Sequence, residues 1–267
     1  MRTSLGVWRV PLRSVRIAAP GHGRARCLFM ELLTVLRASP LFAGIDSPTL
    51  RRLLAAMSEE STPARRQLMG PAQSTEHFRV IVSGRVKIVR SSAEDGRELT
   101  LWLLGPGDGF DVVSLLDGRT HAVSAWSLTP VRILRAPLAT WNGWLRWLRP
   151  LDLAAHRYCA AKLREVADLA SDLALCDTPT RLAHLLLRHF EAGEENLLRD
   201  LPQRELAAMI GSVRVVVSRA LAQLSAQGAV QLQDGAPHAV DLERLLARAR
   251  GDTAASPLRS AAAERRR

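Results

Sequence analysis

The spacing of apolar residues changes twice along the chain, from helical to alternating and back to helical. Residues 30–59 place leucines at helical intervals. Between residues 60 and 135, apolar and polar residues alternate in short runs that Gly, Asp and Pro separate, as around Phe78 and Val80. Helical intervals return from residue 137 onward. Short strands at this spacing predict a small β-barrel or jelly roll, so the fold class is predicted to be α+β.

Residues 150–176 carry the pattern of a long helix that pairs with a second helix. Side chains recur there in steps of three and four, at the dimer-seam positions His156, Cys159, Leu163, Val166, Ala170 and Leu173, and all of them are apolar or small except the polar His156. This is the heptad spacing of a coiled coil, and it runs over nearly three heptads. An amphipathic helix packed on its own domain produces a similar pattern, so both readings stay open, with dimerisation favoured.

Residues 201–227 predict two helices joined by a tight turn. The first helix is expected to bury Leu206, Ala207 and Ile210. Gly211 supplies the turn, and Ser212 is expected to cap the second helix. That helix turns one set of residues inward (Val217, Leu221, Leu224) and another outward (Arg214, Val215, Ser218, Arg219). Such a pair fits a DNA major groove, although any helical hairpin with solvated Arg would share the pattern.

Four segments together resemble the Crp/Fnr family of transcription regulators. The run from Ala207 to Leu224, followed by a hairpin with Asp234-Gly235 at its turn, looks like the family's winged helix-turn-helix. The other segments are Ser39-Pro-Leu-Phe-Ala-Gly44, Val82-Ser-Gly-Arg-Val-Lys-Ile88 and Leu104-Gly-Pro-Gly-Asp108. The match runs in order over residues 32–249. It implies an N-terminal double-stranded β-helix (jelly-roll) sensor domain, a long dimerisation helix and a C-terminal winged helix-turn-helix.

The predicted domain organisation follows this resemblance. A cyclic-nucleotide-binding-like sensor is expected over residues 30–149, the dimerisation helix over 150–176, and the DNA-binding domain over 177–250. Residues 251–267 are expected to be a disordered tail. Residues 1–29 form a basic extension, interpreted either as untranslated, with the true start at Met30, or as a flexible arm that contacts phosphates. Eight of the eleven net positive charges lie in these two tails, so charge alone does not indicate DNA binding.

The resemblance also implies which residues contact DNA. Arg214 stands at the base-reading position, where a guanidinium can donate two parallel hydrogen bonds to guanine. Ser218 and Arg219 fall where the family contacts bases or phosphates, Ser212 at the start of the recognition helix, and Gln203 where it can reach a phosphate. Val215 replaces the Glu of many members. Its side chain can meet only apolar surface such as a thymine methyl, which predicts a half-site that differs at one base pair.

The family's effector cassette corresponds to residues 110–125. Val112 stands in place of the Glu that binds ribose, and Val123 in place of the Arg that binds the cyclic phosphate. A buried phosphate would lack charge-assisted hydrogen bonds there, so cyclic AMP in the family's usual pose is not expected. A shifted loop could bring Arg119 to the phosphate. The candidate effector pocket comprises Val112, Val113, Ser114, Arg119, His121 and Ser124.

The cofactor is left unknown by the sequence. Its cysteines, Cys27, Cys159 and Cys176, form no C-x-x-C pair and are too few for an iron–sulfur cluster, and no metal site is predicted. Haem stays possible, with His77, His121, His156 and Cys159 as candidate ligands by type. A regulator without an effector also remains open.

Enzymes are the first rival class, and the chain has no G-x-S-x-G elbow, P-loop or His-carboxylate cluster. The second rival is a cyclic-nucleotide-binding regulatory module without DNA binding. A cyclic-nucleotide-binding or haem-type gas-sensing module whose effector controls DNA binding is the alternative function. No run of about 18 apolar residues predicts a membrane span. We therefore expect a cytoplasmic, homodimeric regulator that binds an inverted repeat in double-stranded DNA and acts with RNA polymerase.

Overall fold

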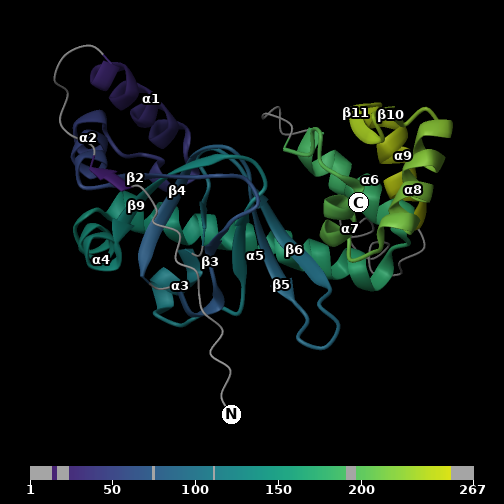
Figure 1. Ribbon diagram of the computed structural model, residues 1–267, viewed down its shortest axis with the longest axis horizontal. Coiled ribbons are helices and arrows are strands. Elements are labelled where there is room, and N and C mark those ends of the chain that lie inside the picture. Colours follow the sequence, from purple (N-terminus) through teal and green to yellow (C-terminus); the bar gives the residue numbers. More distant parts are fainter. Residues whose placement is uncertain (1–13, 17–23, 74–75, 111, 191–196, 254–267) are drawn as a thin grey trace, which may run out of the picture. The chain divides into compact units, whose positions relative to one another are not determined.

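The computed structural model describes residues 14–16, 24–73, 76–110, 112–190 and 197–253 (Figure 1). Its contacts divide the chain into two units. The first comprises residues 1–86, 105–121 and 126–156, and the second comprises residues 87–104, 122–125 and 157–267. The domain boundaries expected from the sequence stay predictions. None of the helices in the described residues combines the length and the apolar character needed to span a bilayer.

The chain enters through α1 (Arg24–Ala38), a 3-10 turn η1 (Pro40–Phe42) and α2 (Ser47–Ala55). Leu32, Leu33 and Leu36 of α1 are buried. Helix α1 begins six residues before Met30, and Phe29 is buried in it. A short strand, β1 (Ser14–Arg16), pairs antiparallel with β2. These parts of the basic extension are therefore regular structure, whereas residues 1–13 and 17–23 lie outside the described residues, as do residues 254–267 of the predicted tail.

A five-stranded sheet forms the centre of the first unit. Its order is β1–β2–β9–β4–β7, with β2 at Ser58–Thr62, β9 at Val131–Pro137, β4 at His77–Ser83 and β7 at Gly109–Phe110. The neighbouring strands pair antiparallel, with Ile81 opposite Ile133 in the centre. Both isoleucines are buried because the strand interiors are apolar on their inner face. The alternating run in the sequence therefore predicts the correct element type.

A four-stranded sheet, ordered β3–β8–β5–β6, contains the remaining strands of the β-region. Its members are β3 (Gln67–Met69), β8 (Ser124–Ser127), β5 (Val86–Ser91) and β6 (Glu98–Leu104). Two helices accompany the strands, α3 (Val112–Asp117) and α4 (Leu138–Trp147), besides a 3-10 turn η2 (Pro71–Gln73).

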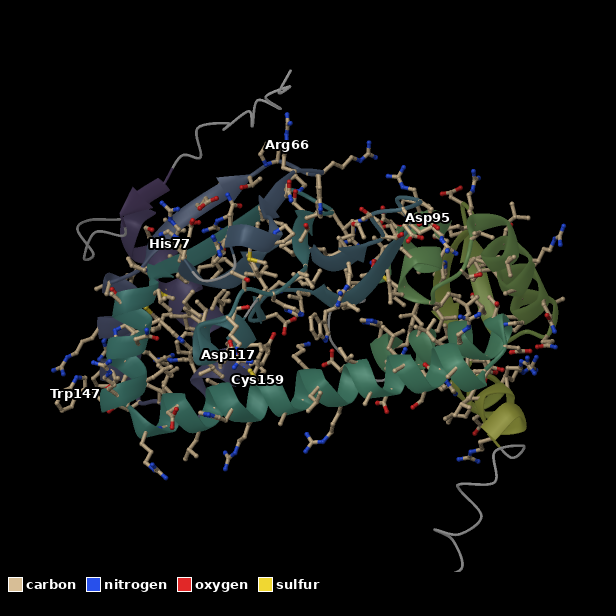
Figure 2. All side chains as sticks on the ribbon, turned by 90° about the horizontal axis from the view of Figure 1, so that it is seen from below. Arg66, His77, Asp95, Asp117, Trp147 and Cys159 are labelled. Atoms are coloured by element: carbon tan, nitrogen blue, oxygen red, sulfur yellow. The ribbon has the colours of Figure 1, made fainter. Side chains whose placement is uncertain are left out.

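Helix α4 closes the core of the first unit through an aromatic stack. The Trp141 ring lies on the Phe78 ring of β4 with centroids 3.9 Å apart and planes 13° apart. Trp141 is completely buried, whereas Trp147 at the end of the same helix is 87% exposed and projects outward (Figure 2). The apolar face of α4 therefore ends before its last turn.

The second unit contains most of the C-terminal helices. Helix α5 (Arg149–Leu175) enters it and is followed by α6 (Thr178–Phe190), α7 (Gln203–Met209), α8 (Arg214–Ala226) and α9 (Leu242–Thr253). Helix α6 packs against both α8 and α9 through buried leucines such as Leu182 and Leu186. Together these helices hold the helix-turn-helix in place.

A two-stranded hairpin, β10 (Val230–Gln233) and β11 (Ala236–Val240), follows α8. Asp234 and Gly235 form its turn with φ of 52° and 78°. Two consecutive positive φ values are those of a type I′ turn, for which Asp-Gly is a favoured pair. The hairpin predicted from the sequence is confirmed.

Candidate DNA-binding site and effector cassette

The turn between α7 and α8 depends on Gly211. Leu206, Ala207 and Ile210 are buried before it, as the sequence predicts. Gly211 adopts φ +59°, and a Cβ atom there would lie 2.5 Å from Leu173 Cδ2 of α5. Glycine is favoured at this position because it accepts the left-handed conformation and has no Cβ. The close approach allows α5 to pack directly against the turn.

The predicted cap of α8 is wrong. Val213, in the extended conformation, occupies the N-cap position and provides no side-chain hydrogen bond. Ser212 instead closes the preceding turn, because its backbone N–H donates to the Ala207 carbonyl at 2.9 Å. The turn thus extends one residue further than the sequence pattern suggests, and the half-buried Ser212 lies just before the helix start.

Helix α8 has one buried and one exposed face. Val217, Leu221 and Leu224 are completely buried, so this face fixes the helix against α6. The opposite face exposes Arg214, Val215, Ser218 and Arg219, and Val215 is 60% exposed. Within the part of the chain that the structure describes, neither Arg214 nor Arg219 forms an ion pair. The two guanidinium groups are therefore available to an external partner.

Gln203, at the start of α7, has a role that the sequence did not predict. Its Nε2 donates to the Gly235 carbonyl at 2.9 Å, 32 residues along the chain. This bond joins the first helix of the helix-turn-helix to the turn of the hairpin. The half-buried Gln203 side chain therefore positions the hairpin, and its amide carries a second N–H that this bond does not use.

The effector cassette is apolar at both positions that the family's ligand chemistry requires. Val112, the first residue of α3, is 3% exposed, and Val123 is 2% exposed. Neither side chain can contribute charge or a hydrogen bond, and each is part of the core. Arg119, the candidate substitute, is exposed, with its backbone N–H bonded to Asp117 Oδ1 at 2.9 Å.

The other predicted pocket residues differ in burial. Ser114 is buried, Val113 is 44% exposed, and His121 and Ser124 are half-buried. Only part of the predicted set can therefore line an interior cavity. Among the candidate haem ligands, half-buried His77 has a pKa lowered by burial and by nearby arginines, so it remains neutral at pH 7.

Helix α5 separates a buried side from an exposed side along its length. Leu151, Ala155, Tyr158 and Leu169 are buried. On the predicted seam, Leu163 is 70% exposed, His156 and Ala170 are exposed, and Cys159, Val166 and Leu173 are half-buried. Figure 2 shows the helix as one uninterrupted rod with a row of side chains that project from it. Burial raises the pKa of the Cys159 thiol, which disfavours the thiolate.

Comparison with known proteins decides the family. Residues 180–248 match the Crp-like helix-turn-helix domain, and residues 60–146 match the cyclic nucleotide-binding domain. A CRP-like cAMP-activated global transcriptional regulator of Mycobacterium tuberculosis is 30% identical over 222 residues, covering 81% of this chain and 99% of that protein. The chain belongs to the Crp/Fnr family of transcription regulators. It is a regulator with a helix-turn-helix and a cyclic-nucleotide-binding-type domain, and not an enzyme.

A second relative agrees with this assignment, and a solved structure shares the fold. The cyclic AMP receptor protein of Thermus thermophilus is 31% identical over 204 residues, covering 75% of this chain and 92% of that protein. The structure of FixK2 from Bradyrhizobium japonicum has the same fold, with a TM-score of 0.64, 23% identity, and coverage of 72% of this chain and 96% of that one. The segments that match the two domain families, residues 180–248 and 60–146, lie within the DNA-binding and sensor domains predicted from the sequence.

Proposed function

We propose that the protein binds an inverted repeat in double-stranded DNA as a homodimer, each protomer inserting α8 into a major groove. The observation that carries this proposal is the division of α8 into a fully buried apolar face and an exposed face with two arginines that have no ion-pair partner among the described residues. A two-fold dimer implies half-sites about one helical turn apart, roughly 10 bp from centre to centre.

Arg214 is the proposed reader of guanine, since its planar guanidinium can bond O6 and N7 together. Ser218 and Arg219, one turn further, contact neighbouring bases or phosphates. Ser212, just before α8, and Gln203, at the start of α7, contact the DNA backbone in this proposal, Gln203 with the amide N–H that Gly235 does not use. Val215, exposed between the two arginines, meets the methyl group of thymine.

The exposed side of α5 is the proposed dimer seam. Leu163, on the predicted seam, is a large apolar side chain that is 70% exposed, on a helix whose other side is already packed. Pairing with the same helix of a second copy would remove this surface from water, at about 25 cal/mol per Å² of apolar area. His156 and Cys159 would then lie in or beside the interface.

The sensor is proposed to be degenerate toward cyclic AMP. Val112 and Val123 are buried parts of the core, so the phosphate and ribose would meet no charge at these positions. The regulator would act in the cytoplasm with RNA polymerase. An effector, if one binds, would not be cyclic AMP held in the family's usual pose.

Gel-shift titration at several salt concentrations tests the DNA-binding proposal. The wild-type protein should lose affinity steeply as salt rises, because phosphate contacts release counterions. Arg214→Ala should reduce binding to the selected site and leave binding to random DNA nearly unchanged. Arg52→Ala, which removes an exposed arginine of α2, is the matched control and should change neither. Equal losses on both DNAs for Arg214→Ala would contradict base reading.

Binding-site selection with Val215→Glu tests the role of Val215. A carboxylate at this position can accept a hydrogen bond from cytosine, so the variant should move toward the family's common half-site. The wild-type protein should select a different base pair there. Selection of the common half-site by the wild-type protein would refute this role.

The effector proposal is tested on the protein as purified. Titration calorimetry with cyclic AMP should show no saturable heat at micromolar ligand. An absorption spectrum and mass spectrometry of the native protein then report any bound small molecule. A Soret band would identify haem, and saturable cyclic AMP binding would overturn the degenerate sensor.

A further inference from the structure

The junction of α5 and α6 brings together three side chains with metal-binding donor atoms. Asp172 lies in the last turn of α5, Cys176 directly follows the helix, and His184 is in the second turn of α6. Their oxygen, sulfur and nitrogen atoms all lie within 4.8 Å of one another. We propose that Asp172, Cys176 and His184 form a binding site for a divalent transition-metal ion, with zinc as the best match.

Asp172 is the buried centre of this cluster, at 7% exposure. Its Oδ1 is 2.7 Å from His184 Nδ1, and its Oδ2 accepts a hydrogen bond from Arg188 Nη1 at 3.1 Å. Arg188 therefore orients the carboxylate and leaves Oδ1 directed at the other donors. An outer partner that fixes a ligand in this way is a regular feature of metal sites.

Metal binding requires deprotonated ligands. The ion would take the place of the proton between His184 Nδ1 and Asp172 Oδ1, which lie 2.7 Å apart, and this proton would leave to solvent. The Cys176 thiol would lose its proton to solvent as the ion binds.

The donor set selects the class of ion. One thiolate, one imidazole and one carboxylate are ligands typical of zinc, whereas calcium and magnesium prefer oxygen donors throughout. Zinc bonds of about 2.0–2.3 Å in tetrahedral geometry place ligand atoms about 3.3–3.5 Å apart. Because all three donor atoms lie within 4.8 Å of one another, no pair would have to approach by more than about 1.3 Å. The Asp172–His184 contact of 2.7 Å would have to lengthen slightly. Water can supply the fourth ligand.

The position of the cluster gives the ion a structural consequence. Asp177 alone separates Cys176 from the first residue of α6, and its Oδ1 accepts from the Thr180 backbone N–H at 2.8 Å. An ion at the cluster would therefore tie the end of the long helix to the helix on which α8 and α9 pack. An effect on DNA affinity rests on the proposed function, whereas metal binding itself does not.

Cobalt(II) is the probe that distinguishes this site, because thiolate coordination gives a charge-transfer band in the near ultraviolet. The full-length protein, first treated with a chelator, should bind one Co²⁺ per chain with this band, and Zn²⁺ should displace it. Cys176→Ser should abolish the band and weaken Zn²⁺ binding at least 10-fold, and His184→Asn should also weaken binding at least 10-fold. Cys27→Ser is the matched control, because Cys27 is an exposed cysteine of α1 outside the cluster, and it should keep both the band and the affinity for Zn²⁺.

Circular dichroism of each metal-free variant shows whether it remains folded, and Cys176→Ser, at a half-buried position, gives the decisive comparison if His184→Asn unfolds. Absence of saturable uptake by the wild-type protein would overturn the site. A band that survives Cys176→Ser or disappears in Cys27→Ser would overturn it as well. If cobalt binds and Zn²⁺ does not change the DNA affinity, the metal site stands but its coupling to DNA binding is rejected. If the protein binds cobalt but no DNA, only the proposed function is contradicted.

Discussion

Helix α8 and the effector cassette differ in which side chains they expose and which they bury. Helix α8 exposes arginines and a valine that is 60% exposed, and it buries only the face that packs on α6. The cassette buries valines, at 2–3% exposure, at the two positions where cyclic-nucleotide-binding relatives are expected to have charged groups. The difference supports the proposal that α8 presents charge to an external partner, whereas the cassette uses these two positions for packing.

The largest difference in stability is expected when an arginine replaces a valine in each of the two regions. Val123→Arg places a guanidinium in the core without a partner and should lower the free energy of unfolding by about 3–5 kcal/mol. Val215→Arg on the exposed face of α8 should change it by no more than about 0.5 kcal/mol. Urea denaturation measures both. Similar stabilities for the two variants would mean that the cassette is open to water.

The next largest effect concerns Arg214. Arg214→Ala should cost about 1–3 kcal/mol of discrimination between the specific site and random DNA, because two hydrogen bonds to guanine are lost. Competition gel shifts with both DNAs measure the ratio of affinities. An unchanged ratio would mean that α8 does not read bases through this residue.

Charge inside the DNA-binding unit can be examined through His189 at the end of α6. Burial, assisted by Arg188 and Lys162, lowers the pKa of His189 to about 4, whereas the unfolded chain has a value near 6.5. The unfolded state therefore takes up a proton first as the pH falls below about 6.5. The contribution of His189 to the free energy of unfolding is fully present above pH 6.5 and decreases toward pH 4. Between pH 7.5 and 5 the decrease is about 2 kcal/mol.

Urea denaturation of the wild-type protein and of His189→Gln at the two pH values isolates this contribution. The variant should lose less stability on acidification than the wild-type protein does. Equal losses in the two proteins would show that His189 is protonated as easily in the folded state as in the unfolded one.

The smallest expected effect is the difference in stability between two Gly→Ala variants. Gly211→Ala should lower stability by about 1–2 kcal/mol from the positive φ alone, and by more where the new Cβ meets Leu173. Gly44→Ala, with φ +79° and open space around it, is the matched control and carries only the backbone cost. Thermal unfolding of the two variants should therefore rank Gly211→Ala as the less stable, and the reverse order would contradict the close packing of α5 on the turn.

Features encoded over a few residues could be predicted from the sequence. The two faces of α8, the Asp234-Gly235 turn and the extent of α5 follow from periodicity and turn chemistry that act within one element. The cap of α8 could not be predicted, because Ser212 is drawn into the preceding turn by its bond to Ala207, and a sequence pattern does not show which of two competing local bonds will form.

Contacts between elements far apart in the chain could not be predicted from the sequence. The bond from Gln203 to Gly235 spans 32 residues, and the Asp172–Cys176–His184 cluster shares no recognised motif spacing. No sequence pattern predicted the proposed metal site, because the three side chains meet only when α6 turns back beside the end of α5. The resemblance to the Crp/Fnr family reached the right family but not these contacts.

Selection of binding sites from random duplexes by the full-length protein tests the central claim most directly. We expect an inverted repeat with half-sites roughly 10 bp apart and a guanine in each half whose preference is lost in Arg214→Ala. A single unpaired half-site, or the same guanine preference in the wild-type protein and in Arg214→Ala, would contradict base reading by paired copies of α8.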